Sequence, residues 1–214
     1  DAQIEADVEL RYGSIGGELQ AEGHGELVLT GGSIGGDATL SGLSSAQLGD
    51  IGGDANVERV AGDLQLSSVG GDTSIERVDG RVHLAHSGGD MNIERVEGDV
   101  HLGHSGGDVN IATVRGVVQI GNIGGDLNLS AGFALNSASS ITVGGDANIE
   151  LPRNANLTLR ATVGGDVSGE RLVSSGGGMS GRSMEGGCGS SLATLRMSSG
   201  KVCASNGTRP VRSW

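Results

Sequence analysis

Four histidines are the residues whose type and spacing come closest to a reactive site. They form two pairs, His83 with His86 and His101 with His104, which occupy equivalent positions of neighbouring sequence repeats. Imidazole nitrogens bind zinc and other transition metals, so four of them in adjacent layers of a fold would offer a metal site. Residues three apart on a strand usually point to different sides, however, and no paired cysteine or carboxylate triad accompanies them. We predict a structural ladder of histidines, with no bound metal or other cofactor.

Aspartates that follow glycine pairs at a fixed interval are a second candidate for chemistry. The triplet GGD recurs through the chain and supplies Asp54, Asp72, Asp90, Asp108 and Asp126. Acidic β-roll repeats bind calcium between their turns, but their nine-residue unit, GGxGxDxUx, has a third glycine that is missing here. A carboxylate beside a tight turn more often accepts hydrogen bonds from backbone N–H groups. We expect the aspartates to cap turns, and calcium binding stands as the alternative.

No arrangement typical of catalysis is present. The sequence contains no G-x-S-x-G, Walker or H-E-x-x-H motif. Solenoid enzymes that cleave polysaccharides combine clustered Asp, Arg or Lys with aromatic platforms. This chain has one lysine, Lys201, and three aromatic residues that lie far apart, Tyr12, Phe133 and Trp214. We predict that the protein is not an enzyme.

A sequence repeat with a period of about 18 residues must position these side chains, and a fixed period is typical of stacked architectures. Residues 52–123 read GGDANVERVAGDLQLSSV, GGDTSIERVDGRVHLAHS, GGDMNIERVEGDVHLGHS and GGDVNIATVRGVVQIGNI. Each unit splits into two similar nines in which apolar and polar residues alternate, which is the period of a strand. The glycine pairs lie where the chain must turn tightly or take a positive φ.

Stacking such units is the way to bury their apolar faces, because two short strands cannot do so alone. The sequence therefore predicts an all-β fold, a single right-handed parallel β-solenoid with about eight coils of about 18 residues. The nine-residue half-repeat favours a cross-section with two sides.

Equivalent residues of successive coils should lie about 4.8 Å apart and form columns on the surface. The expected structural columns are Asp54, Asp72, Asp90, Asp108 and Asp126; Asn56, Ser74, Asn92, Asn110 and Asn128; Glu58, Glu76 and Glu94; and Arg59, Arg77 and Arg95. Asparagines can hydrogen-bond to one another along a column. Repulsion between like charges is modest at an exposed surface, and the adjacent Glu and Arg columns offset it.

The repeat divides the chain into three parts. Residues 1–12 alternate cleanly and predict one N-terminal strand that caps the solenoid or pairs with a neighbour. Residues 13–170 form the solenoid. Residues 171–214 form a Gly/Ser-rich segment with two candidate short strands, SLATLRMSS and KVCAS, which packs on its own solenoid or docks on another subunit. Within it we expect Cys188 and Cys203 to form a disulfide, with free buried thiols as the alternative.

Charge is distributed unevenly along the chain, whose net charge is −12. Residues 1–150 carry 23 acidic and six basic side chains, a net charge of −17, and residues 151–214 carry three and eight, a net charge of +5. The acidic excess argues against a nucleic-acid partner, and an acidic body with a basic end suits head-to-tail attraction between copies. No apolar stretch approaches the ~20 residues of a membrane span. The start at Asp1 fits a secreted chain whose leader has been removed.

The phrase GGDMNIERVEGDVHLGHSGGDVNI resembles the adhesin-like β-solenoid domains, of the putative auto-transporter adhesin head type, found in bacterial cell-envelope proteins. Bactofilins, cytoskeletal β-solenoids that polymerise end to end, are a more distant resemblance. The similarity covers roughly residues 14–170. It implies a right-handed β-solenoid at the cell surface without catalytic residues.

These features predict a secreted structural subunit of an extracellular filament whose partner is another copy of the chain, joined head to tail. The residues expected at the contact are Ile4, Val8, Leu10, Tyr12, Arg209, Arg212 and Trp214. One alternative is a monomeric cell-surface adhesin or envelope-associated binding module that displays its acidic face. A calcium-stabilised, β-roll-like protein is the third possibility, and a chelator should reduce its order.

Overall fold

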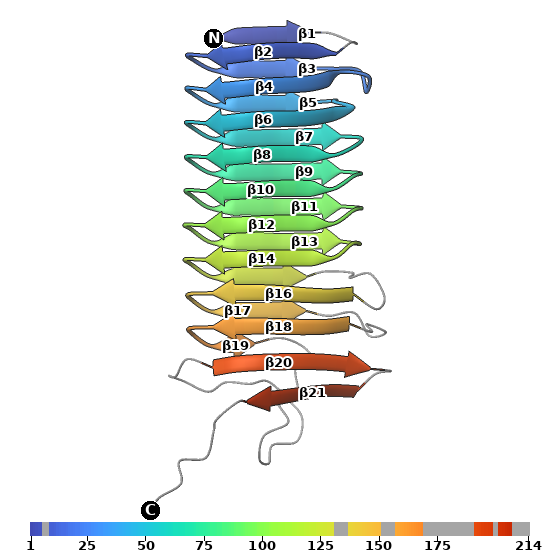
Figure 1. The fold of residues 1–214 in the computed structure, drawn as a ribbon, viewed down its shortest axis with the longest axis vertical. Coiled ribbons are helices and arrows are strands. Elements are labelled where there is room, and N and C mark those ends of the chain that lie inside the picture. Colours follow the sequence, from blue (N-terminus) through green and yellow to red (C-terminus); the bar gives the residue numbers. More distant parts are fainter. Residues whose placement is uncertain (6–8, 131–136, 151–156, 169–190, 199–200, 207–214) are drawn as a thin grey trace, which may run out of the picture.

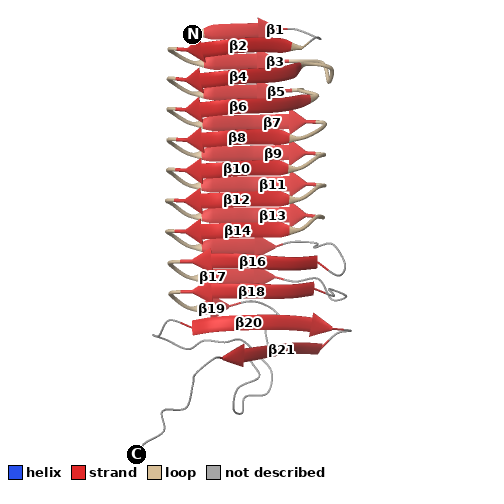
Figure 2. Cartoon of the chain, in the orientation of Figure 1, coloured by secondary structure: helices blue, strands red, loops and turns tan. Residues whose placement is uncertain are grey.

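The chain folds into a rod of stacked β-strands that lie across its long axis (Figures 1 and 2). The structure is a computed structural model that describes all residues except 6–8, 131–136, 151–156, 169–190, 199–200 and 207–214. The described part of the chain contains 21 strands and no helix. It accordingly contains no helix long and apolar enough to cross a membrane. The all-β prediction is confirmed.

Two sheets form the two sides of the rod. Sheet A has ten strands, in the order β1 (Ala2–Glu5), β3 (Leu19–Glu22), β5 (Ala38–Ser41), β7 (Ala55–Val60), β9 (Thr73–Val78), β11 (Met91–Val96), β13 (Val109–Val114), β15 (Leu127–Ser130), β17 (Ala147–Glu150) and β19 (Val167–Ser168). Sheet B has eleven strands, in the order β2 (Leu10–Ile15), β4 (Val28–Ile34), β6 (Ser45–Ile51), β8 (Leu64–Val69), β10 (Val82–Ser87), β12 (Val100–Ser105), β14 (Val118–Ile123), β16 (Ser137–Val143), β18 (Leu157–Val163), β20 (Ser191–Ser198) and β21 (Lys201–Asn206).

The chain alternates between the sheets, so successive turns add parallel strands. β3 to β18 make the eight turns that the repeat predicts, and the two-sided cross-section is the one that the half-repeat favours. Equivalent residues of successive repeats face each other in the regular coils, as where Met91 lies between Thr73 and Val109. The offset is shorter from β5 to β7, where Leu40 faces Val57, and longer from β15 to β17. The register therefore follows the spacing of the glycine pairs.

Three inward-facing side chains from each regular strand fill the interior. In β7 these are Ala55, Val57 and Val60, and two consecutive outward residues separate the last two. Full burial of a Val, Ile or Leu side chain contributes about 1.5–3 kcal/mol, and every turn adds such residues from both sheets. Among the polar residues buried inside, the hydroxyls of Thr73 and Ser87 lie 3.4 Å apart. The narrow interior is filled by aliphatic side chains, which explains the scarcity of aromatic residues.

The N-terminal segment differs from its prediction as a single strand. β1 pairs with β3 in sheet A, and β2 pairs with β4 in sheet B, so the segment forms both sides of a first turn. Alternation of apolar and polar residues continues from one side to the other, which makes two short strands look like one in the sequence.

The C-terminal segment contains the two predicted short strands, β20 and β21. β20 runs antiparallel to β18, with Ala193 opposite Ala161, and β21 runs antiparallel to β20. This hairpin covers the end of sheet B within the same chain (Figure 1). Cys188 and the side chain of Cys203 lie outside the described residues, and their disulfide stays a prediction.

Candidate functional site

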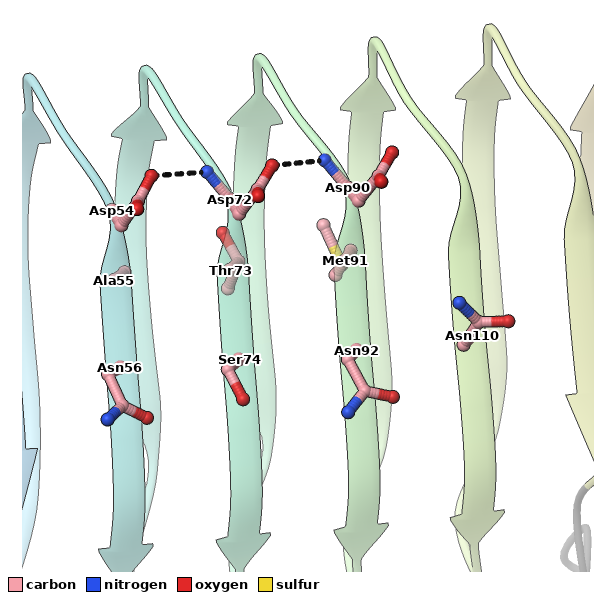
Figure 3. Close-up of a pocket in the computed structure, with 10 residues that line it drawn as sticks. All are labelled: Asp54, Ala55, Asn56, Asp72, Thr73, Ser74, Asp90, Met91, Asn92 and Asn110. Atoms are coloured by element: carbon pink, nitrogen blue, oxygen red, sulfur yellow. Dashed lines mark hydrogen bonds between the residues drawn. The ribbon is translucent and has the colours of Figure 1, made fainter.

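Acidic side chains occupy the corner position just before the sheet A strand in every described turn. We name as the Asp column the residues Asp37, Asp54, Asp72, Asp90, Asp108, Asp126, Asp146 and Asp166, which lie just before the strands β5 to β19. Asp1 and Glu18 take the same position before β1 and β3. All of these side chains are exposed, so the column is a continuous acidic line along the rod. Figure 3 shows three of its members, Asp54, Asp72 and Asp90.

The Asp column is held by hydrogen bonds between successive turns. The Oδ1 atom of each aspartate accepts the backbone N–H of the next one, at N–O distances of 2.7–2.9 Å from Asp37 through to Asp166. Figure 3 shows two of these bonds, from Asp72 to Asp54 and from Asp90 to Asp72. One carboxylate oxygen is thus fixed by the backbone, while the side chain as a whole lies exposed at the surface.

The glycine pairs make room for this arrangement. A Cβ atom at the second glycine of a pair, such as Gly71, would overlap Oδ1 of Asp54 in the preceding turn. A Cβ at the first glycine, Gly70, would overlap the carbonyl oxygen of Gly52. Among the described residues only Gly25 and Gly42 have positive φ. Close approach between turns, and not a positive φ, is therefore what requires glycine at the pairs.

A column of neutral hydrogen-bonding side chains runs beside the Asp column on the outer face of sheet A. In register its members are Gln3, Gln20, Thr39, Asn56, Ser74, Asn92, Asn110, Asn128, Asn148 and Ser168. Asn128 Nδ2 donates to Asn110 Oδ1 at 3.0 Å. An open depression of about 320 Å³ lies where the two columns cross β7 to β13, around the short side chain of Ser74 (Figure 3).

The predicted Glu and Arg columns lie on the same outer face. Arg59, Arg77 and Arg95 face one another in register. Arg77 Nε binds Asp79 Oδ1 at 2.8 Å, two residues along its own chain, so its ion pair is not with the Glu column. Glu58 accepts a hydrogen bond of 2.7 Å from the Ser41 hydroxyl.

A second Asp ladder lies at the other corner of the coil, and sequence reasoning missed it. Asp63 Oδ1 accepts the backbone N–H of Arg81 at 2.8 Å, and Oδ2 binds the Arg81 guanidinium at 2.8 Å. The hydrogen bond from the guanidinium, followed by that from the backbone, lowers the pKa of Asp63 below its ordinary value. Asp99 likewise accepts the N–H of Val117. The signal was the Gly-Asp pair in the second nine, which Arg81 and Val117 interrupt.

The histidines form pairs on the outer face of sheet B. Ring centroids are 6.2 Å apart for His83 and His101 and 6.4 Å apart for His86 and His104. All four are exposed, and His101 Nε2 contacts Gln119 Oε1 in the next turn. The expectation that residues three apart would point to different sides is wrong here, because two consecutive outward residues precede the last inward one. Within the described ranges, no group of three or more His, Cys, Asp or Glu side chains could hold a metal ion.

Of the residues predicted to contact another copy, three can be placed. Ile4, Leu10 and Tyr12 lie in the first turn, only partly buried against the core. The ring of Tyr12 occupies the space left by the missing side chain of Gly31. Its hydroxyl is buried without a hydrogen-bond partner, and burial raises the pKa of Tyr12 to about 12. Val8, Arg209, Arg212 and Trp214 lie outside the described residues.

Comparison with known protein families places the chain beside one of them. A family model described as Toastrack DUF4097 matches residues 35–202, which is more than three quarters of the chain. No curated protein and no solved structure matches this chain. The family match agrees with the β-solenoid prediction and does not establish the adhesin-like or bactofilin-like identity.

Proposed function

This chain belongs to the Toastrack DUF4097 family, and on that premise we propose that it is a non-catalytic, rigid binding module. A β-solenoid of this family is a structural or binding module in general terms. The more specific role that we propose is the presentation of the acidic outer face of sheet A to a cationic partner, such as a basic segment of another protein.

The observation that carries this proposal is the unbroken Asp column. Its charges are spaced by one strand separation, about 4.8 Å. Two unit charges in water interact with an energy of RT at about 7 Å, so neighbouring charges of the column act together on a counterion. A polycation that replaces the held counterions releases them, which favours binding at low salt. The neutral column beside the aspartates supplies amide and hydroxyl groups that can bond a partner without opposing its charge.

Substitution of aspartate by asparagine tests this proposal, because asparagine keeps an Oδ1 that can accept the backbone N–H. The test variant is Asp54→Asn, Asp72→Asn, Asp90→Asn and Asp108→Asn combined. Binding of a fluorescent arginine-rich peptide to the full chain is followed by anisotropy at about 50 and about 200 mM salt. We expect the variant to lose about tenfold or more in affinity and to show a shallower dependence on salt.

The matched control removes four acidic charges away from the Asp column, in the variant Glu26→Gln, Asp50→Asn, Asp79→Asn and Glu97→Gln. It changes the net charge by the same amount, so it separates a local effect from a general one. Equal loss of affinity in both variants, with both still folded by circular dichroism, would show that the column has no special role.

End-to-end assembly is a second candidate, favoured by the first turn of the rod. There β1 and β2 are edge strands of their sheets, and Ile4, Leu10 and Tyr12 are only partly buried. The hairpin of β20 and β21 weighs against it, because the hairpin covers the opposite end of sheet B. Electron microscopy of the full chain should show fibres that disappear when residues 1–12 or 171–214 are deleted. Fibres formed by either shortened chain would exclude this assembly.

A location outside the cell is part of the same proposal, supported by the resemblance of the repeat to the solenoid domains of bacterial cell-envelope proteins. Protease treatment of intact cells of the source organism should degrade the protein. Complete protection, with degradation only after lysis, would overturn this location.

A further inference from the structure

Between β4 and β14 the outer face of sheet B is almost without charge, in contrast to that of sheet A, whereas β2 before them carries the exposed Arg11. We name as the B face the three outward rows of residues that run from β4 to β14. The two flanking rows are Thr30, Gln47, Gln65, His83, His101 and Gln119; and Ser33, Asp50, Ser68, His86, His104 and Asn122. With histidine neutral, Asp50 is the one formally charged residue of the B face.

The middle row of the B face contains nothing larger than serine. This row of Gly32, Gly49, Ser67, Ala85, Gly103 and Gly121 runs between the two rows of longer polar side chains. Backbone packing between turns is close there, since a Cβ at Gly103 would overlap the carbonyl oxygen of Ala85 and one at Gly121 that of Gly103. The surface is therefore a shallow trough flanked by amide, imidazole and hydroxyl groups, into which the side chains of a second sheet can fit.

Charge indicates what can cover this face. The chain carries a net charge of −12, and the acidic columns of sheet A repel the acidic columns of a second copy. A second copy can approach the B face without that opposition, since Asp50 is the sole formal charge there. Columns of Gln, His, Ser and Asn on two such faces can interdigitate and hydrogen-bond, as paired sheets do when identical side chains meet.

The size of the surface fits the same partner. The six strands of the B face, β4 to β14, span roughly 25–30 Å along the rod and about 20 Å across it. This gives about 500–600 Å² for each copy, or about 1,000–1,200 Å² in total, which is the size of a weak, reversible interface.

We propose that two copies of the chain pack back to back through the B face, related by a two-fold axis. The small-residue row of each copy receives one flanking polar row of the other, and the same patch serves both copies, as a two-fold interface requires. Pairing in this way leaves both sheet A faces on the outside. The dimer is independent of the proposed binding role and would present two acidic faces instead of one.

Sedimentation velocity of the full chain over a range of concentrations tests the proposal. We expect a monomer–dimer equilibrium in the unmodified chain. The variant Gln65→Glu with Gln119→Glu places like charges in the contact without changing side-chain size, and it should weaken the dimer at least tenfold. The control Asn92→Asp with Asn128→Asp adds the same charge to sheet A and should leave the dimer intact. A monomer at all concentrations, or a dimer unaffected by the sheet B variant, would overturn the proposal.

Small-angle X-ray scattering of the dimer distinguishes it from end-to-end assembly. Back-to-back pairing thickens the rod and leaves its maximum dimension nearly unchanged, whereas end-to-end pairing nearly doubles that dimension. A dimer of doubled length would contradict pairing through the B face. Binding of the arginine-rich peptide is a separate measurement, so failure of the proposed function and failure of the dimer are seen independently.

Discussion

At the scale of single residues, the second glycine of each pair and the aspartate that follows it act together. The glycine leaves space for a carboxylate oxygen from the preceding turn, and that oxygen bonds the backbone N–H of the next aspartate. The repeated GGD triplet is therefore one structural unit distributed over two turns. The role of the triplet follows from the stacking of the turns, because these contacts join the residues of one triplet to those of the next and not the residues within one triplet.

Substitution of Gly71 by alanine should destabilise the protein by about 1–3 kcal/mol. The new methyl group would displace Oδ1 of Asp54 and leave the N–H of Asp72 without its acceptor. Thermal unfolding followed by circular dichroism measures the change. Gly16→Ala is the matched control, because a Cβ there meets nothing within 4 Å, and it should be neutral or slightly stabilising. Equal stability of the two variants would contradict the steric explanation.

The ionisation of the Tyr12 phenol can be followed without overlap from other phenols, because Tyr12 is the single tyrosine of the chain. Burial raises its pKa to about 12, whereas an exposed tyrosine ionises near pH 10. The unfolded chain therefore loses this proton first as pH rises. The contribution of Tyr12 to stability is complete below about pH 10 and is lost as pH rises toward 12. Phenolate absorbance of the folded protein should report a pKa near 12, and of the chain in denaturant a pKa near 10. A value near 10 in the folded protein would show that the first turn is open at this residue.

At the scale of strands, the regular repeat made most elements predictable. Alternating residues after each GGD gave the strands, and the fixed period gave their register and the Asp, Asn, Glu and Arg columns. The division of residues 1–12 was not predictable, because alternation is uninterrupted where the chain passes from one side of the coil to the other. The Asp63 ladder was hidden because Arg81 breaks its pattern. The antiparallel pairing of β20 with β18 left no signal, since strand partners outside a repeat are not encoded by a period.

At the scale of the whole molecule, the rod is a sum of nearly equivalent turns. Each turn contacts the turns beside it, so stability is roughly additive in the number of turns. The two sides are nevertheless not interchangeable, because the Asp column is continuous at the corner before sheet A, whereas Arg81 and Val117 interrupt the aspartates at the corner before sheet B.

Removal of one complete turn should preserve the fold, whereas removal of half a turn should not. Deletion of residues 70–87 joins Val69 to Gly88 and keeps every later strand in its sheet. Deletion of residues 79–87 moves all later strands to the opposite sheet, which separates the GGD corners from their partners. We expect a cooperative transition within a few degrees of the full chain for the first and a far lower one for the second, by thermal circular dichroism. Similar stability of both would show that the two halves of the coil are equivalent.

The hydrogen bonds of the Asp column all point the same way. In every bond from Asp37 to Asp166 the acceptor belongs to the earlier turn and the donor to the later one. The rod therefore has a chemical polarity along its axis, as a helix does, although it contains no helix among its described residues. A partner that binds along the Asp column therefore meets a surface whose two directions along the rod differ in chemistry, in addition to a row of charges. Its two possible orientations are inequivalent even where the repeats themselves are identical.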